Sequence, residues 1–404
     1  MSRKVIHITS SLTGGAGVAA LALAELQADN GDRVIIYTRT RNANSNHQNI
    51  QISYLPRLAV LGVLSKALTW IQQRLTSKDF GVLTIFSQNY LLMRRLKRES
   101  PTQIHIHNWY NLTNLRQITK ISKSYKVVMH LHDERLFTGG CHNTLGCTNY
   151  LKNCTSCPAI KRANTLVNYN FVRESKLKRD WESIGLISPS NWMFDKHSNS
   201  IDHKITKQVL PNVTNWRFQK SIRPKKTAEG FSTALFIAAD VNVELKRLNF
   251  AVQAINEWNL NNPNSQLRLK VIGGNSPEIN KDTKAVTFVG SKNSEEIHKL
   301  MSEADVLFVT SSSENYPNVI VEGQLNHLIV ISNSVGGVPE MIQDGQTGFL
   351  FKESKESFFS SLERFFSLSP DERAEMVQAA FNYQFAKSQP DRIYKKLNEF
   401  VDSL

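Results

Sequence analysis

The chain has 404 residues, of which 41% are apolar and 21% are charged. This length exceeds one ordinary hydrophobic core and this composition is that of a globular protein, so we expect two domains. No run of about 18 uncharged apolar residues occurs, which excludes a membrane-spanning helix of the usual kind.

Lysine and arginine (49) outnumber aspartate and glutamate (35), which gives a net charge of +14. Such a surplus favours anionic partners: nucleic acid, nucleotide phosphates or an acidic bilayer. A well-solvated basic surface is the alternative. The segment Met1–Ile8 leads directly into a predicted strand and lacks the apolar core of a signal peptide. We therefore expect a cytoplasmic protein.

The first elements predict a β-loop-α-β unit. A strand over Val5–Thr9 is followed by a glycine-rich turn at Gly14–Gly17, an Ala/Leu-rich helix over Val18–Ala28 and a strand over Arg33–Thr38. Glycine-rich turns allow the backbone to approach a ligand closely. The G-x-G-x-x-G dinucleotide fingerprint is not met, because the spacing differs and no acidic residue ends the second strand.

Two basic segments follow. Val63–Leu75 carries apolar residues at helical spacing, with Lys66 and Arg74 among them, and Leu91–Arg98 combines four basic residues with leucines and a methionine. A basic amphipathic helix of this kind can lie on an anionic membrane surface. An ordinary helix that faces the protein core is the alternative.

Further strands alternate with helical segments, which predicts parallel sheets in both halves of the chain. We expect strands at Gln103–His107, Lys126–Leu131, Gly185–Ser188, Ser232–Ala238, Leu267–Ile272, Ala285–Val289, Asp305–Thr310 and Leu328–Ser332. The low-apolar segment Arg217–Gly230 is the best linker candidate. It separates a first domain, 1–212, from a second, 228–380.

Four histidines stand near the C-terminal ends of two predicted strands: His105, His107, His130 and His132. The carboxyl ends of parallel strands are where open α/β sheets bind ligands. A histidine satisfied within the core is the alternative for each of them.

All four cysteines of the chain fall in one stretch. They are Cys141, Cys147, Cys154 and Cys157. In a cytoplasmic protein this clustering predicts a tetrathiolate zinc site rather than disulfides, with free or redox-active thiols as the alternative. Because a site of four sulfur ligands leaves no open position, such a zinc would be structural.

The segment Ser312–Glu322 follows the apolar strand Asp305–Thr310. Glu314 therefore lies in the loop at the C-terminal end of that strand. Pro317 can open the next helix, and Glu322 falls about a turn and a half inside it. Two carboxylates thus flank a strand–loop–helix junction, whose helix start is suited to phosphate.

Several motifs together resemble one family. They are Glu314-x7-Glu322, Gly336–Glu340 (Gly-Gly-Val-Pro-Glu), Asp344–Phe349, Pro189–Trp192 (Pro-Ser-Asn-Trp) and Leu210–Asn212 (Leu-Pro-Asn). The chain resembles the retaining glycosyltransferases of the GT-B class, family 4 (glycosyl transferases group 1). The block from His132-Asp133 to Cys157-Pro158 resembles a subgroup that acts in bacterial exopolysaccharide assembly, including colanic-acid-type transferases. This narrower resemblance also implies a Cys-rich insertion over residues 133–160 of the first domain.

This resemblance implies an α/β fold in which two Rossmann-like domains face each other across a cleft, with a C-terminal helix, 385–404, that crosses back to the first domain. It implies transfer of a hexose from a nucleoside diphosphate sugar to a saccharide or lipid-linked saccharide in surface polysaccharide synthesis. No cofactor is required for such a reaction. An anionic membrane surface, at the inner face of the plasma membrane, is a further expected partner, and nucleic acid is not.

The resemblance also implies roles for individual residues. The catalytic set is Glu314 near the donor sugar, Lys246 and Arg247 at the leaving diphosphate, and His132 from the first domain. The donor-binding set is Gly14, Gly15, Gly17, Asn315, Asn318, Val319 and the ribose-binding Glu322. His107 and Asp133 line the acceptor side. Lys246 and Arg247 are expected at the start of a helix over Lys246–Trp258, where the family has Gly in place of Arg247.

Two other functions fit parts of the sequence. The charge and the cysteines fit a non-catalytic, zinc-stabilised protein that binds nucleic acid, although no recognised nucleic-acid module is present. The same fold would also serve sugar-nucleotide epimerisation, or phosphorolysis with a lysine-bound pyridoxal cofactor. We favour glycosyl transfer by front-face attack, because no separate nucleophile is apparent.

Overall fold

The computed structural model describes residues 2–41, 43, 45, 47–56, 90–110, 112–160, 164–181, 183–200, 204–214, 231–275 and 285–404. The chain divides into two compact units. The N-terminal unit comprises Met1–Val213 together with Pro390–Leu404, and the C-terminal unit comprises Thr214–Gln389. The predicted domains, 1–212 and 228–380 with a returning helix at 385–404, lie close to this division. The predicted linker lies largely outside the described residues.

The N-terminal unit is built on a parallel sheet with the strand order β3-β2-β1-β4-β5-β6-β7. Its strands are β1 (Lys4–Ile8), β2 (Arg33–Thr38), β3 (Ile50–Tyr54), β4 (Gln103–Ile106), β5 (Lys126–His130), β6 (Ile184–Ser188) and β7 (Lys207–Val209). Strand order reverses between β1 and β4. This is the topology of a doubly wound dinucleotide-binding sheet.

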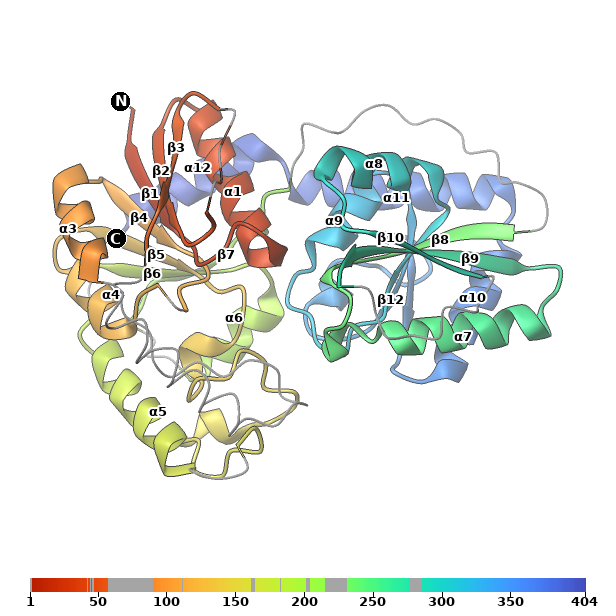
Figure 1. Cartoon of the computed structure of the whole chain (residues 1–404), viewed down its shortest axis with the longest axis horizontal. Helices are drawn as coiled ribbons and strands as arrows, with labels where there is room; N and C mark the ends of the chain where they lie inside the picture. The colour runs from red at the N-terminus through yellow and green to blue at the C-terminus, as the bar shows by residue number, and fades with distance from the viewer. Residues whose placement is uncertain are drawn as a thin grey trace. The chain divides into compact units, whose positions relative to one another are not determined.

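Helices cover both faces of this sheet, because β1, β2, β5 and β6 carry apolar side chains on both sides (Figure 1). The helices are α1 (Gly14–Asp29), α3 (Tyr90–Glu99), α4 (Leu115–Ser122), α5 (Asn164–Lys178), α6 (Asn191–Ser198) and α12 (Pro390–Asp402). Helices α1 and α12 pack through Leu26 and Leu397 on one face. Helices α3 and α4 pack through Leu96 and Ile118 on the other. The C-terminal helix therefore completes the core of the N-terminal unit.

The C-terminal unit repeats this plan with the order β10-β9-β8-β11-β12-β13, again all parallel. Its strands are β8 (Phe231–Asp240), β9 (Gln266–Gly274), β10 (Val286–Gly290), β11 (Val306–Val309), β12 (Ile329–Asn333) and β13 (Phe349–Phe351). Strand order reverses between β8 and β11. In such sheets ligands bind beyond the carboxyl ends of the strands at this reversal.

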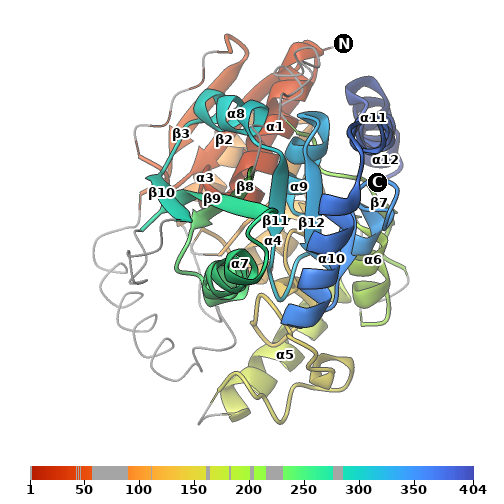
Figure 2. The same cartoon turned by 90° about the vertical axis from the view of Figure 1, so that its right-hand side faces the viewer.

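Helices flank the sheet of the C-terminal unit (Figure 2), and two hydrophobic cores hold them to it. The helices are α7 (Leu248–Asn261), α8 (Ser294–Glu303), α9 (Asn318–Leu325), α10 (Lys355–Ser367) and α11 (Pro370–Lys387). On one face, Phe358 of α10 lies edge-on to Phe308 and Phe351 of the sheet. Burial of each such ring contributes about 1.5–3 kcal/mol. On the other face, Ile320 of α9 joins the second core.

The predicted helix over Lys246–Trp258 begins two residues too early. Glu244–Lys246 forms a 3₁₀ turn, Arg247 adopts a left-handed conformation (φ 54°), and α7 begins at Leu248. The apolar spacing that predicted the helix starts at Leu248, so the two basic residues precede the helix. Strands β3, β7 and β13 were not predicted either, and β7 and β13 have only three residues each.

Of the two basic segments, Leu91–Arg98 forms most of α3, whose Leu92 and Leu96 are buried in the core. The core-facing interpretation therefore holds for this helix, whereas Val63–Leu75 lies outside the described residues. Among the helices that the structure describes, none combines the length and the apolar character needed to cross a membrane.

Candidate active site

Lys246 and Glu314 meet where the strand order of the C-terminal sheet reverses. Lys246 lies six residues beyond the end of β8, and Glu314 lies five residues beyond the end of β11. The Lys246 ammonium donates to the Glu314 carboxylate over 2.5 Å. Their side chains are 36% and 12% exposed, so the pair is accessible from solvent. An ion pair thus bridges the position at which open α/β sheets bind ligands.

The backbone around Lys246 is tied to the end of β11. The Thr310 hydroxyl donates to the carbonyl oxygens of Lys246 (2.9 Å) and Arg247 (3.2 Å). The Ser312 amide donates to the Leu245 carbonyl over 2.8 Å. These bonds fix the two loops against each other, so the ion pair is held by backbone as well as by charge.

Gly336 and Gly337 hold Glu314 from the other side. The Gly337 amide donates to the Glu314 carbonyl over 3.1 Å. Gly336 has φ 57°, and a Cβ atom there would lie 1.7 Å from the Glu314 carbonyl oxygen. Only glycine satisfies both the left-handed backbone and this close approach. The Gly-Gly motif is therefore a support for the Glu314 loop.

Glu322 lies on α9, which begins after Pro317 as the sequence predicts. Its neighbours Ile320 and Val321 are fully buried, whereas Glu322 lies between core and solvent. Desolvation raises the pKa of Glu322 to about 7. Among the described residues, no hydrogen bond to its carboxylate compensates for this burial. A ligand that supplies hydroxyl donors would stabilise the charged form.

The other predicted site residues of the C-terminal unit are Arg247, Asn315, Asn318 and Val319. Arg247 donates to the Glu353 carbonyl over 3.1 Å and stacks on Phe250, 4.4 Å from the ring centre, so its guanidinium is engaged away from Lys246. Asn315 lies in the loop after Glu314. Asn318 and Val319 form the first turn of α9, where the helix dipole favours anions.

In the N-terminal unit, the glycine-rich turn leads from β1 into α1. Gly14 begins the helix at φ 76°, and the space that a side chain would occupy at Gly14 and Gly15 is open. Gly17 differs, because a Cβ atom there would lie 2.5 Å from the Ser11 carbonyl oxygen. Gly17 is thus required for packing of the helix on its own loop. Gly14 and Gly15 are the glycines that leave room for a ligand.

His107 and His132 are joined by a hydrogen bond of 3.0 Å between Nδ1 of His107 and Nε2 of His132. The bond is one link in a buried chain that also contains His7 and Gln27, which the sequence analysis did not single out. The sequence shows only that His7 lies within a predicted strand; the pairing of β1 with β4, which places His7 opposite His105, comes from the structure. Burial lowers the pKa of His132 to about 4, so its imidazole is neutral at physiological pH.

Asp133 does not contact His132 through a described hydrogen bond but accepts one from Nδ1 of His142 over 2.7 Å. Burial opposes ionisation of Asp133, and the charge of His142 and its hydrogen bond nevertheless bring the pKa of Asp133 below its ordinary value. The next residues anchor the insertion: Arg135 forms a buried pair with Glu174 over 2.9 Å, both 2% exposed. Asp133 therefore orients the insertion through its hydrogen bond with His142.

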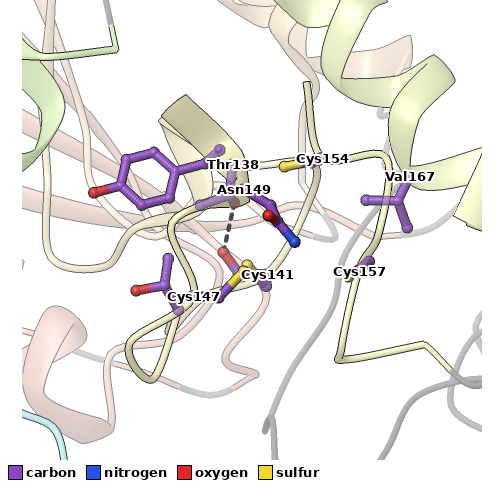
Figure 3. Close-up of a pocket in the computed structure, with 10 residues that line it drawn as sticks. Thr138, Cys141, Cys147, Asn149, Cys154, Cys157 and Val167 are labelled. Carbon is purple, nitrogen blue, oxygen red and sulfur yellow. Dashed lines mark hydrogen bonds between the residues drawn. The ribbon is translucent and has the colours of Figure 1, made fainter. Parts of the chain in front are cut away.

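The four cysteines line one small cavity of about 20 Å³ in this insertion, with Thr138, Asn149 and Val167 among its other walls (Figure 3). Burial raises the pKa of Cys141 to about 12 and that of Cys154 to about 11. A cavity of this size holds about one water molecule or ion. Yet nowhere in the described chain are three or more His, Cys, Asp or Glu side chains placed to hold a metal ion. The zinc site therefore stays a prediction.

Comparison with known proteins finds a family match for the part of the chain that holds this site. Residues 232–367 match the family described as "Glycosyl transferases group 1". The C-terminal unit, which holds Lys246, Glu314 and Glu322, therefore contains a glycosyl transferases group 1 domain. The predicted enzyme class, a glycosyltransferase, is confirmed at this level.

A curated glycosyltransferase is similar to part of the chain. The chain is 26% identical over 162 residues to a D-inositol 3-phosphate glycosyltransferase of Corynebacterium aurimucosum, an alignment that covers 35% of this chain and 38% of the relative. The chain thus aligns with less than half the length of this curated relative.

Solved structures share the fold over the whole chain. The Anabaena protein HepE, in complex with UDP and glucose, is 15% identical with a TM-score of 0.65 and full coverage of both chains. WaaG, a glycosyltransferase involved in lipopolysaccharide biosynthesis, is 16% identical with a TM-score of 0.64 over 96% of this chain and 98% of WaaG. The predicted fold, with two Rossmann-like domains of the GT-B type, is confirmed.

The support of Glu314 by Gly336 can be tested with a matched pair of variants. Gly290 shares the left-handed backbone (φ 78°), but the space for its Cβ is open. Gly290→Ala should cost about 1–2 kcal/mol of unfolding free energy, from backbone strain alone. Gly336→Ala adds a clash with the Glu314 carbonyl and should cost about 3 kcal/mol or more. Equal losses in urea unfolding would show that Gly336 does not support the loop.

The zinc prediction has a direct test in the metal content of the purified protein. A tetrathiolate site predicts zinc in equimolar amount and a lower melting temperature after chelation. Without metal, the raised pKa values of Cys141 and Cys154 predict slow reaction with thiol reagents at pH 8 that accelerates on unfolding. Absence of metal, together with four thiols that all titrate once the protein is unfolded, would reject the site.

Proposed function

We propose that the protein is a retaining hexosyltransferase, which moves a hexose from a nucleoside diphosphate sugar to a saccharide or lipid-linked saccharide. The observation that carries this proposal is the Lys246–Glu314 pair at the strand reversal of the C-terminal sheet, inside the matched domain. Cleavage of the donor leaves a diphosphate, and the group that must be stabilised there is its negative charge.

Lys246 supplies that stabilisation in the proposed reaction. Its ammonium has three donors, of which Glu314 takes one, and its side chain is 36% exposed. The remaining donors are available for phosphate oxygens. Glu314 holds the ammonium in place before the donor binds, so that less rotamer entropy is lost when the phosphate arrives. The start of α9 adds positive polarity on the same edge of the sheet.

Glu322 would bind the ribose. Its two carboxylate oxygens can accept hydrogen bonds from two vicinal hydroxyls at once. The raised pKa of Glu322 supports this role, because a buried carboxylate without hydrogen-bond donors gains most from a ligand that brings them. Asn315, Asn318 and Val319 would contact the sugar and phosphate through the loop and the first turn of α9.

The N-terminal unit would contribute the acceptor side. We assign Gly14 and Gly15 to close approach of the donor diphosphate, His132 to the donor sugar, and His107 to support of His132. Asp133 remains an acceptor-side candidate through the insertion that it orients. Arg247 would reach the diphosphate only after its bond to the Glu353 carbonyl breaks.

A UDP-hexose is the first donor to test, because HepE is bound to UDP and glucose in its structure. For the acceptor, the likeness to WaaG, a glycosyltransferase of lipopolysaccharide biosynthesis, supports a surface polysaccharide intermediate. The exposed basic side chains of α3, Arg94, Lys97 and Arg98, would suit an anionic membrane that carries such an acceptor.

Retention follows from front-face attack in this proposal. The bond from the anomeric carbon to the leaving phosphate oxygen breaks, a bond to the acceptor hydroxyl oxygen forms, and the hydroxyl proton passes to the leaving phosphate. Incubation with UDP-glucose and saccharide acceptors, followed by NMR of the product, tests this step. An α-linked product from the α-linked donor supports retention, and a β-linked product overturns it. Release of an epimerised sugar nucleotide would favour the epimerase alternative instead.

The role of Lys246 can be tested against a matched control. Lys355 forms an ion pair with Glu257 at the same distance, 2.5 Å, but away from the strand reversal, and its side chain is 40% exposed against 36% for Lys246. Lys246→Met should lower kcat about 100–1000-fold, because one charge-stabilising donor is lost from the transition state. Lys355→Met should leave kcat within about twofold. Similar kinetics for the two variants would remove Lys246 from the proposed chemistry.

The raised pKa of Glu322 predicts a pH-dependent donor affinity. The charged form of Glu322 accepts the ribose hydroxyls, and its fraction rises as the pH passes through about 7. The Kd for UDP-glucose should therefore fall about tenfold between pH 6 and pH 8. Glu322→Gln should bind more weakly and without this dependence. Calorimetric titration that gives one Kd at both pH values for the unmodified protein would contradict the assignment.

A further inference from the structure

A chain of hydrogen bonds runs through the interior of the N-terminal unit on the face covered by α1. Its members are Gln27, His7, His107, His132, His105 and His130. Three adjacent strands place the histidines on one face of the sheet. His7 of β1 pairs with His105 of β4, and the histidines two residues further along β4 and β5 share that face. Five imidazoles therefore converge near the strand reversal between β1 and β4.

Gln27 of α1 joins the two branches of this hydrogen-bonded chain. Its side-chain amide has an acceptor oxygen on one side and a donor nitrogen on the other. Its Oε1 lies 2.7 Å from Nε2 of His7, and its Nε2 lies 3.3 Å from Nε2 of His105. An amide oxygen only accepts and an amide nitrogen only donates. His7 must therefore carry its proton on Nε2, and His105 must leave Nε2 unprotonated. Gln27 is itself fully buried, so water does not compete for these bonds.

The remaining proton positions follow link by link, because a neutral imidazole has one donor and one acceptor nitrogen. His7 accepts at Nδ1 from Nε2 of His107 over 3.0 Å. His107 in turn accepts at Nδ1 from Nε2 of His132 over 3.0 Å. His132 is thereby left with its lone pair on Nδ1. Burial lowers the pKa of His7 to about 4 and that of His107 well below its ordinary value, which keeps the links neutral.

The second branch has the opposite sense. His105 accepts from Gln27, so its Nδ1 carries the proton and donates to Nε2 of His130 over 2.9 Å. His130 is left with its proton on Nδ1. The amide of Gln27 therefore sets opposite tautomers at His7 of β1 and His105 of β4, which are neighbouring strands. This arrangement pairs a donor with an acceptor at every link of the chain, and a buried nitrogen left unpaired would cost about 1–3 kcal/mol.

We propose that Gln27 is a positioning residue that fixes His132 as a hydrogen-bond acceptor at Nδ1. The group that His132 meets must then donate a proton, as a sugar hydroxyl does and an ionised phosphate does not. The identity of that hydroxyl as one on the substrate rests on the proposed function; the tautomer does not. The branch from His132 is a positioning device and not a path for proton release. It reaches the amide oxygen of Gln27, which is a very weak base.

Two substitutions at Gln27 separate the branches. Gln27→Met retains the length of the side chain and removes its donor and its acceptor. The tautomers of both branches are then no longer fixed. Gln27→Glu offers an acceptor at both ends. It should leave His7, His107 and His132 as they are but reverse His105 and His130. A merely structural role for Gln27 predicts no such difference between the two branches.

Nitrogen NMR of the ligand-free protein with labelled histidine reports which ring nitrogen carries each proton. His132→Gln and His130→Gln identify the two signals. The unmodified protein should show His132 protonated on Nε2 and His130 protonated on Nδ1. In Gln27→Met both tautomers of His132 should appear, and in Gln27→Glu only His130 should change. The unmodified protein supplies its own test if a variant does not fold.

His132 protonated on Nδ1 in the unmodified protein would overturn the inference, as would a single unchanged tautomer in Gln27→Met. Kinetics then connect the tautomer to function. Gln27→Met should lower kcat for UDP-glucose about tenfold, the equivalent of one hydrogen bond, and Gln27→Glu should lower it less. Failure of the unmodified protein to bind any sugar nucleotide would reject the proposed function, and the tautomer result would stand.

Discussion

The account depends on one constraint, the reversal of strand order in a parallel sheet. At this position the loops after two adjacent strands leave in opposite directions, so the carboxyl ends of β8 and β11 are not covered by a single connection. Lys246 and Glu314 occupy the loops that diverge there and are joined by an ion pair of 2.5 Å. The surrounding glycines, hydroxyls and backbone bonds serve to hold this pair at the edge of the sheet.

The same constraint operates in the N-terminal unit with different chemistry. There the reversal lies between β1 and β4, and the residues that meet are His7, His105 and His107. They are fully or almost fully buried, so each polar nitrogen must find a partner inside the protein. A charged pair suits the accessible edge of one sheet, and a neutral hydrogen-bonded chain suits the buried face of the other. Burial thus decides which kind of polar site each sheet carries.

Much of this structure was predictable from local patterns. Apolar runs gave the central strands, and Pro317 with the following apolar residues gave α9, because both depend on neighbours in sequence. Strands β7 and β13 have three residues each, which is too few for a pattern. The helix start near Lys246 was misplaced because Arg247 adopts a left-handed conformation that the sequence does not announce.

The partners of the candidate residues were harder to predict, because they depend on contacts across the fold. Nothing near Glu314 in sequence indicates that Gly336 lies against its carbonyl. Likewise, Gln27 lies 78 residues from His105, and only the pairing of β1 with β4 brings them together. The resemblance of motifs identified which residues matter, and the packing shows what each one does.

The central claim is that the edge of the C-terminal sheet at β8 and β11 receives the donor diphosphate. Amide hydrogen exchange with and without UDP-glucose tests it most directly, because bound phosphate and sugar protect the amides that they contact. We predict slower exchange in the loops at residues 242–247 and 312–320. Donor binding that protects amides elsewhere in the C-terminal unit and leaves both of these loops unchanged would contradict the account.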